Sequence, residues 1–314
     1  MEFILPLTKV NKSSVNQAGG KGASLGEMVR AGFPVPPGFV VLASAFDKYL
    51  AESDVGVEIE SALRKVKPED TESVEEAAEI IRHLIRQTKM DSDLQQSILT
   101  DYKKLQAEYV AVRSSATVED SKLDSWAGEL ESYLDTTEDM LLDRVRDCWA
   151  SLFTPRAIFY RYARQLEKKK ISIAVVIQKM IESEVAGVAF SVHPITKDYN
   201  QMIIEAGWGL GESIVLGKIT PDSYVVAKDE EKIVDSNVSE QTMMITRRQD
   251  GGGVEETSVP ADRQNKQKLA EAEIIKLART VKKIEKHYGS PQDIEWAYAQ
   301  GKLYVVQARP ITTL

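Results

Sequence analysis

The sequence predicts a protein of both helices and strands, an α+β fold, in a chain long enough for two lobes. Its 314 residues exceed one average domain, which favours two domains or one large two-lobed unit. Runs rich in β-branched residues, such as 171–178 and 185–194, alternate with amphipathic helical patterns such as 77–85 and 270–284. We expect an N-terminal lobe at 1–180 and a C-terminal lobe at 181–314.

Composition excludes several classes of protein. A formal net charge of −8 argues against a nucleic-acid-binding surface, and a single cysteine, Cys148, excludes an intrachain disulfide or a cysteine-rich zinc site. No run approaches the roughly 18 consecutive apolar residues of a membrane span, and the N-terminus does not read as a signal peptide. We expect a cytoplasmic protein that contacts neither membrane nor nucleic acid.

The first informative stretch is Gln17–Met28, in which three glycines surround Lys21 ahead of a helix. Glycines let the backbone approach a ligand closely, and a helix start supplies free amides and a positive dipole end, so the pattern suits phosphate. It is not the P-loop pattern, and an ordinary glycine turn before a helix is the alternative.

Two further expectations concern the segment between these motifs. Residues 55–70 are predicted to be a charged, poorly patterned surface segment, and Ser73 with Glu76 is predicted to form a capping box.

A second stretch, Val110–Asp120, reads as a buried strand that delivers Arg113 to its end and continues into a serine-rich loop. Guanidinium suits phosphate because its planar fork donates two parallel hydrogen bonds. A strand end with a surface salt bridge is the alternative. After it, Ala127-Gly128 leaves a bare backbone that suits a phosphate chain, unless the segment is a simple hairpin.

Two later strand ends suit a nucleotide. Residues 171–178 form a strongly β-branched strand ending in Gln178-Lys-Met180, where backbone groups can read a base edge while a thioether packs on its face. His193 could be a catalytic base or a phosphate acceptor, and a structural histidine at a strand end is the interpretation we favour. Gly207-Trp-Gly-Leu-Gly-Glu-Ser213 resembles a dinucleotide loop, but its spacing differs from the Rossmann fingerprint.

The C-terminal stretch predicts a hairpin. Strands at 291–297 and 303–310, joined by a Gln300-Gly301 turn, place Glu295 near Gln307, with Arg309 on the same face. A carboxylate and an amide oxygen suit magnesium, and an arginine beside them suits phosphate. A routine hairpin with a salt bridge is the alternative.

Taken together, these stretches resemble the nucleotide-binding domain of the phosphoenolpyruvate synthase and pyruvate phosphate dikinase family, an ATP-grasp relative. The matching motifs occur in family order and span nearly the whole chain. They are Gly-Gly-Lys-Gly-Ala-Ser-Leu at 19–25, Val-Pro-Pro-Gly-Phe at 35–39, Val-Arg-Ser-Ser-Ala-Thr at 112–117, Ala-Gly at 127–128, Gln-Lys-Met at 178–180, Gly-Trp-Gly-Leu-Gly-Glu at 207–212, Asp-Ile-Glu-Trp at 293–296 and Gln-Ala-Arg-Pro at 307–310.

The resemblance implies an ATP-grasp-like α+β fold of two lobes, with mainly antiparallel sheets and flanking helices, that enclose a nucleotide cleft. It also implies a role for each matching position. Lys21, Arg113 and Arg309 would grip the triphosphate as the catalytic set, while Gly128 and Ser132 would line the phosphate loop. Gln178 and the backbone of Lys179-Met180 would hold adenine, and Glu295 with Gln307 would bind Mg²⁺. Trp126 and Ser132 stand where the family usually has phenylalanine and threonine.

The family's ATP-dependent phosphotransferases pass phosphate to a histidine on a separate swivelling domain, which then visits a pyruvate-binding domain. Neither the acceptor motif nor such a domain is found in this sequence. The expected partners are therefore a phosphohistidine domain and a pyruvate- or phosphoenolpyruvate-binding domain, and the chain is expected to be incomplete as an enzyme. The alternatives are the ATP-binding domain of a rifamycin phosphotransferase and a non-catalytic ATP-sensing regulatory module.

Overall fold

The computed structural model describes residues 2–117, 131–166, 171–249, 251–312 and 314. The chain divides into two compact units, the first made of Met1–Glu27 and Pro37–Met180, the second of Met28–Pro36 and Ile181–Leu314. The sequence expectation assigned 28–36 to the N-terminal lobe, and the structure differs there. Pro34 O accepts a hydrogen bond from Val305 N (2.9 Å), and the Phe33 ring meets His287 edge-on at 5.9 Å, so this segment packs with the second unit.

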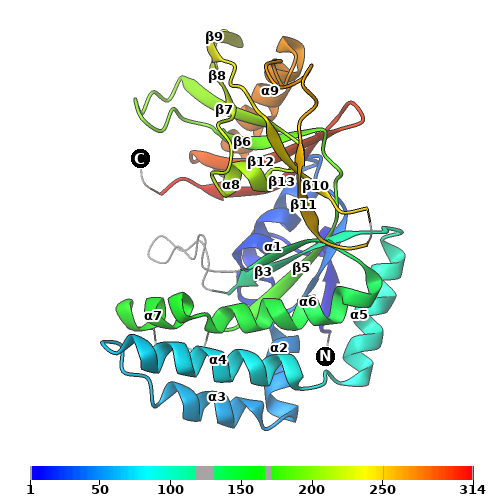
Figure 1. The fold of residues 1–314 in the computed structure, drawn as a ribbon, viewed down its shortest axis with the longest axis vertical. Coiled ribbons are helices and arrows are strands. Elements are labelled where there is room, and N and C mark those ends of the chain that lie inside the picture. Colours follow the sequence, from blue (N-terminus) through cyan, green and yellow to red (C-terminus); the bar gives the residue numbers. More distant parts are fainter. Residues whose placement is uncertain (1, 118–130, 167–170, 250, 313) are drawn as a thin grey trace. The chain divides into compact units, whose positions relative to one another are not determined.

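The first unit contains a five-stranded sheet in the order β1-β2-β5-β3-β4, in which every neighbouring pair is antiparallel. Its strands β3 and β5 lie side by side in Figure 1. Its strands are β1 (Ile4–Pro6), β2 (Gly38–Val41), β3 (Val110–Ala116), β4 (Ser132–Thr136) and β5 (Ile173–Lys179). Its helices are α1 (Val15–Arg30, which crosses into the second unit), α2 (Ala43–Glu52), α3 (Val55–Leu63), α4 (Thr71–Gln87), α5 (Ser92–Lys104), α6 (Glu138–Ala150) and α7 (Pro155–Ala163).

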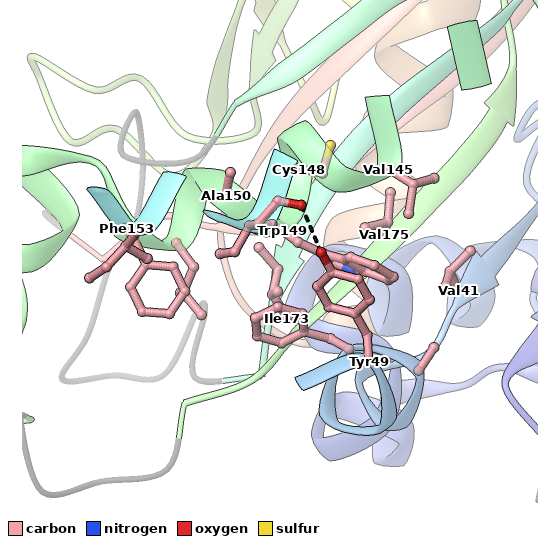
Figure 2. Packing of buried hydrophobic residues seen from close by; sticks show 14 of the residues in the cluster. Val41, Tyr49, Val145, Cys148, Trp149, Ala150, Phe153, Ile173 and Val175 are labelled. Carbon is pink, nitrogen blue, oxygen red and sulfur yellow. Dashed lines mark hydrogen bonds between the residues drawn. The ribbon is translucent and has the colours of Figure 1, made fainter. Parts of the chain in front are cut away.

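Helices bury one face of this sheet in a large hydrophobic core. Val112 of β3 belongs to the same buried cluster as Val175 of β5 and Trp149 of α6. Figure 2 shows Val175 and Trp149 in this core. The Trp149 ring lies 4.9 Å from the ring of Tyr49, whose hydroxyl donates to Ile85 O at 2.7 Å. The core thus fixes the backbone of β3 and β5 and leaves their alternate side chains to the opposite face of the sheet.

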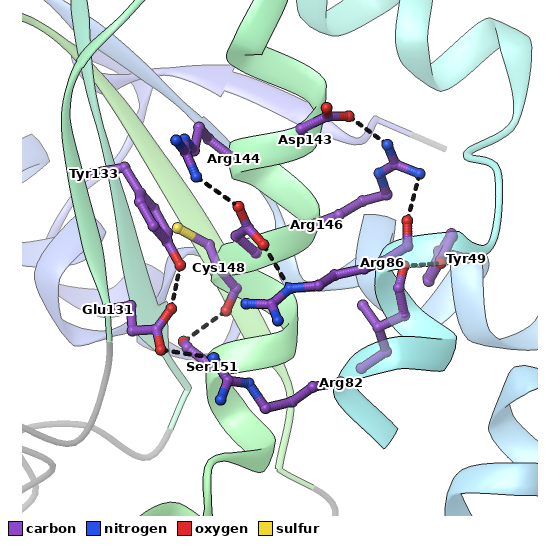
Figure 3. Close-up of polar contacts among 12 residues, drawn as sticks. Tyr49, Arg82, Arg86, Glu131, Tyr133, Asp143, Arg144, Arg146, Cys148 and Ser151 are labelled. Atoms are coloured by element: carbon purple, nitrogen blue, oxygen red, sulfur yellow. Dashed lines mark hydrogen bonds and ion pairs between the residues drawn. The ribbon is translucent and has the colours of Figure 1, made fainter. Parts of the chain in front are cut away.

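A polar layer next to this core connects α4 and α6. Asp147 of α6 accepts hydrogen bonds from Arg86 Nε (2.7 Å) and from Arg144 Nη1 (3.0 Å) (Figure 3). Nearby, Glu131 pairs with Arg82 of α4 at 3.0 Å and accepts a hydrogen bond from the Tyr133 hydroxyl. These partly buried pairs tie the helical layer to the start of β4.

The second unit contains a six-stranded antiparallel sheet in the order β13-β12-β6-β7-β8-β9 and a separate hairpin, β10-β11. The elements are β6 (Val185–Phe190), β7 (Gln201–Trp208), α8 (Glu212–Val215), β8 (Asp222–Ala227), β9 (Lys232–Asn237), β10 (Met243–Arg247), β11 (Val254–Ser258), α9 (Glu271–Tyr288), β12 (Gln292–Ala299) and β13 (Lys302–Pro310). Helix α9 packs against β7, β8, β9 and β12.

A buried ion pair holds the segment that follows β11 to the start of β8. Lys268 Nζ lies 2.8 Å from Asp222 Oδ1, and neither side chain is exposed to solvent. Asp222 also accepts hydrogen bonds from the backbone N–H groups of Ser239 and Lys268 (both 2.9 Å) and from the Tyr224 hydroxyl (2.6 Å). A buried carboxylate needs such a full set of donors, because desolvation otherwise makes its charge costly.

The α+β class with antiparallel sheets and flanking helices is confirmed, whereas two local expectations were wrong. Residues 55–63 form helix α3, because Val55, Ile59 and Ala62 recur at helical spacing and are buried. The cap of α4 is Asp70, whose side chain accepts from Glu72 N at 3.2 Å; Ser73 does not cap the helix. Within the described residues, the structure contains no helix long and apolar enough to cross a membrane.

Candidate functional site

In the first unit, the candidate residues of three strands share the sheet face opposite the large core. Arg113 lies across from Ser132 of β4 and Val176 of β5, and Gln178 lies across from Ala111, two positions before Arg113. Because side chains alternate along a strand, Arg113, Ser132 and Gln178 therefore point to one side of the sheet. Arg113 is only 8% exposed and Gln178 only 2%, so this is a partly enclosed face and not a surface salt bridge.

The glycine–lysine turn, residues 18–22, is bound to β3. Gly19 breaks helix α1 with φ 70° and ψ 171°, a region that side-chain-bearing residues almost never occupy. The Ser115 hydroxyl accepts a hydrogen bond from Gly22 N (3.0 Å) and donates one to Ala18 O (2.9 Å). Lys21 Nζ donates to Ser114 O at 2.7 Å. The sequence pointed to Lys21 and Arg113 separately, and the structure connects them through one strand.

At the strand end that we expected to hold adenine, Lys179-Met180, both backbone N–H groups are hydrogen-bonded within the first unit. Lys179 N donates to Pro37 O (2.8 Å) and Met180 N donates to Tyr109 O (3.1 Å). In this structure these two N–H groups therefore do not face a base edge. Met180 follows β5 directly and is half-buried. Gly128, assigned to the phosphate loop by resemblance, lies outside the described residues, as does Trp126.

In the second unit, the predicted pairing of the C-terminal hairpin is confirmed. Glu295 of β12 is the direct cross-strand partner of Gln307 of β13, and Arg309 is the partner of Asp293. A register shift next to the Glu295–Gln307 pair marks a β-bulge, a feature that re-aims side chains near functional sites. The turn that sets this register is Gln300-Gly301, with φ values of 50° and 71°.

Asp293 was not among the predicted site residues, but it orients Arg309. Arg309 Nε and Nη2 both donate to Asp293 Oδ2, at 2.9 and 2.8 Å. Burial raises the pKa of the Asp293 carboxyl above its usual value. The positive charge and hydrogen bonds of Arg309 lower this pKa, and the negative charge of Glu295 raises it further. The signal was present in the sequence, since Asp293 and Glu295 are two residues apart and so face the same side of β12.

A third carboxylate belongs to the same row of the sheet. Glu205 of β7 and Glu295 of β12 are both cross-strand partners of Val188 of β6. Burial, and after it the charge of Asp293, raises the pKa of Glu205. This face of the second unit is therefore an acidic surface interrupted by the Arg309 guanidinium, which suits a divalent cation accompanied by phosphate.

The glycine-rich loop 207–212 is fixed at its start by a side-chain clamp. Gln241 accepts a hydrogen bond from Trp208 N (2.9 Å) and donates to Trp208 O (3.1 Å). Gly209 has φ 82°, and an added Cβ would stand 2.5 Å from Ile245 O, so only glycine fits there. Burial raises the pKa of Glu212 at the end of this loop.

His193 has a structural role in this chain. Its Nδ1 accepts hydrogen bonds from Ile195 N (3.3 Å) and Thr196 N (3.2 Å) and so shapes the loop between β6 and β7. Among the described residues, no three His, Cys, Asp or Glu side chains are grouped to hold a metal ion by themselves.

Comparison with known proteins agrees with these features. The family model described as pyruvate phosphate dikinase, AMP/ATP-binding domain, matches residues 15–314. A probable phosphoenolpyruvate synthase of Methanocaldococcus jannaschii is 43% identical over 100% of this chain and 27% of its own length. That of Methanothermobacter thermautotrophicus is 42% identical over 100% of this chain and 46% of its own. A rifampicin phosphotransferase of Bacillus subtilis is 35% identical over 99% of this chain and 36% of its own.

The chain thus spans less than half of the length of each of these relatives. Among solved structures, a D-alanine-D-alanine ligase from Helicobacter pylori aligns with 76% of this chain and with 53% of its own chain. The two are 12% identical with a TM-score of 0.32, so this similarity is too weak to assign a role. The family model covers nearly the whole chain. The chain belongs to the family of the pyruvate phosphate dikinase AMP/ATP-binding domain.

Proposed function

We propose that this chain is the ATP-binding, phosphoryl-donating domain of a phosphoenolpyruvate synthase-like enzyme. It would bind magnesium ATP and transfer a phosphoryl group to a histidine on a separate domain. The observation that carries the proposal is the C-terminal hairpin, where Glu295 lies directly opposite Gln307 and Arg309 follows on the same strand, held by Asp293. A routine hairpin has no need to gather a carboxylate, an amide and an oriented guanidinium on one face.

The cationic residues fit a triphosphate. Lys21 in its glycine turn, Arg113 on β3 and Arg309 on β13 are the groups we assign to it. Catalysis of phosphoryl transfer depends mainly on positioning and on neutralising the charge of the transferring group, which lysine and arginine side chains do well. Ser132 lies across from Arg113 and Gln178 shares its sheet face, so they are the further ligand-binding residues proposed in the first unit.

Magnesium fits the donor set of the second unit. Glu295 and Gln307 offer a carboxylate and an amide oxygen, and Mg²⁺ usually takes one or two such protein ligands together with phosphate oxygens. When bound, the ion would neutralise negative charge on the phosphates. The protein's own part is to hold these two oxygens in register across β12 and β13 and to keep Arg309 beside them.

The acceptor would lie outside this chain. The relatives named phosphoenolpyruvate synthase are more than twice as long as the part that this chain matches, which leaves room for a phosphohistidine domain and a pyruvate-binding domain. His193 is a poor acceptor, because its Nδ1 already holds the β6–β7 loop. A rifamycin-type acceptor is the second candidate, and the Bacillus subtilis relative favours it as an alternative.

Calorimetric titration with ATP, with and without Mg²⁺, tests the donor assignment. We expect binding that depends on Mg²⁺ and is weakened at least tenfold by Arg309→Ala or Glu295→Ala. Arg279→Ala is the matched control, because Arg279 is an exposed α9 residue paired with Glu231 and lies outside the proposed site. Unchanged ATP affinity in both Lys21→Ala and Glu295→Ala contradicts the site.

Phosphoryl transfer distinguishes the donor from the sensing module. The chain is mixed with labelled ATP and with a histidine-bearing domain taken from a relative, and the label on that domain is measured. Transfer is the expected result. Tight ATP binding with neither hydrolysis nor transfer would favour a regulatory module, and label appearing on rifampicin, with the corresponding acceptor domains present, would favour the second candidate.

A further inference from the structure

The side chain of Ser115 makes two hydrogen bonds to a segment that is distant in the sequence. It is fully buried on β3, and its hydroxyl bridges the two ends of the glycine–lysine turn, accepting from Gly22 N and donating to Ala18 O. The two partners lie 93 and 97 residues away along the chain. One hydroxyl therefore fixes both the entry and the exit of a five-residue turn that contains Lys21.

We infer that Ser115 is a positioning residue: its hydroxyl fixes the glycine–lysine turn against β3 and so sets where the Lys21 ammonium is presented to phosphate. This inference rests on the proposed role of Lys21 in ATP binding. Ser115 does not itself contact the ligand in this account and acts through the turn.

The chemistry of a hydroxyl explains why serine serves here. A hydroxyl can donate one hydrogen bond and accept another at the same time, whereas alanine, valine or cysteine cannot do both with comparable strength. The space is also limited. An added Cβ on Gly19 would stand 2.2 Å from both the carbonyl oxygen and the hydroxyl of Ser115, so the turn lies directly against the strand. A small side chain with both hydrogen-bonding capacities meets these two conditions.

The strand couples the turn to Arg113. Ser115 is two residues after Arg113, so both face the same side of β3, while Lys21 Nζ is held by the carbonyl of the residue between them, Ser114, at 2.7 Å. The separation between the ammonium and the guanidinium is thereby set by one strand. Two cationic groups that contact one phosphate chain bind it more tightly when their spacing is fixed before binding, because less conformational entropy is then lost on binding.

The test compares two buried serines of the first unit. Ser115→Ala removes the bridge over the turn. Ser151→Ala is the matched control, because the Ser151 hydroxyl is equally buried and also contacts two groups, Cys148 O (2.7 Å) and Ser114 Oγ (3.0 Å), but none of them lies in the turn. Affinities for ATP and for AMP are measured by calorimetry in the presence of Mg²⁺, and the exchange rate of the Gly22 amide is measured by mass spectrometry or NMR.

We expect Ser115→Ala to weaken ATP binding about tenfold, to change AMP binding less than twofold and to accelerate exchange at Gly22. Ser151→Ala should change none of the three. When Ser115→Ala is added to Lys21→Ala, ATP binding should weaken by less than about threefold further, since the ammonium that Ser115 positions is already absent. If Ser115 had a merely structural role, Ser115→Ala would lower the affinities for ATP and AMP alike, and its effect would add fully to that of Lys21→Ala.

Three results would overturn the inference: unchanged ATP affinity in Ser115→Ala, an equal loss for ATP and AMP, or full additivity with Lys21→Ala. Failure of the proposed function looks different. A wild-type chain that binds no ATP contradicts both, whereas a wild-type chain that binds ATP while Ser115→Ala binds it equally well contradicts this inference alone.

Discussion

Gly19→Ala is the substitution whose outcome the structure defines most sharply. Gly19 has φ 70° and ψ 171°, a conformation that costs a side-chain-bearing residue about 1–3 kcal/mol. The new Cβ would also stand 2.2 Å from the Ser115 carbonyl, which β3 holds in its pairing with Ala174 of β5. Forcing one methyl group into so tight a place costs a further ~1–3 kcal/mol.

The comparison of magnitudes decides how the turn responds. Keeping the native turn would cost about 2–6 kcal/mol in total, the sum of the strain and the overlap. Releasing the turn loses its two hydrogen bonds to the Ser115 hydroxyl, about 1–3 kcal/mol together at roughly 0.5–1.5 kcal/mol each. Release is therefore the cheaper response over most of the range. We expect the free energy of unfolding to fall by only about 1–3 kcal/mol, while ATP affinity falls at least tenfold.

Gly32→Ala provides the control. Gly32 also has a left-handed φ of 79°, but an added Cβ there would meet nothing within 4 Å. The control should therefore lose about 1–2 kcal/mol of stability from strain alone and keep its ATP affinity. Urea unfolding followed by circular dichroism gives the stabilities and calorimetry gives the affinities. If Gly19→Ala binds ATP as tightly as Gly32→Ala, the reasoning about the turn is wrong.

Three further predictions concern the second unit. Lys268→Met leaves buried Asp222 without its counter-charge and should lower the free energy of unfolding by about 3–5 kcal/mol in urea. Lys218→Met breaks an exposed pair and should lower it far less; equal losses would contradict the importance of burial. The raised pKa of Glu205 means that the folded state holds its proton more tightly than the unfolded state, so ionised Glu205 lowers stability at neutral pH, and the cost disappears below about pH 4. Glu205→Gln should therefore raise the melting temperature at pH 7 and leave it unchanged near the acid limit, and a gain that does not depend on pH would point to another cause. Asp293→Asn removes the charge that orients Arg309 and should weaken ATP binding about three- to tenfold in calorimetry, less than the loss of Arg309 itself; an effect equal to that of Arg309→Ala would assign Asp293 a direct part in binding.

Patterns that are local in sequence predicted the C-terminal hairpin and its pairing well. The Gln300-Gly301 turn sets the register of β12 and β13, and from that register Glu295 and Gln307 must be neighbours. The bulge beside them was not predictable, because an extra residue in one strand shows itself only when the pairing of both strands is known. Helix α3 was missed because Glu58 and Glu60 obscured the helical spacing of its buried residues.

Features that depend on distant segments could not be predicted from the sequence. The motif Val-Arg-Ser-Ser-Ala-Thr indicated Arg113, but nothing in it distinguishes the roles of its two serines. Ser114 turns its hydroxyl to Ser151 in the helical layer, while Ser115 turns its own to the glycine–lysine turn. That difference comes from strand alternation combined with the packing of α1 on β3, which is a tertiary property.

The assignment of residues 28–36 to the second unit has a consequence for synthesis on the ribosome. The first unit ends at Met180, so its sheet can be completed while the rest of the chain is still being made. Phe33 and Pro34 emerge early, but their partners His287 and Val305 follow only on the order of ten to fifty seconds later, at about 5–20 residues per second. If the gene were split after residue 180, the first fragment would carry residues 28–36, which pack with the second unit, and the second fragment would lack them. The two halves of this chain are therefore not interchangeable modules.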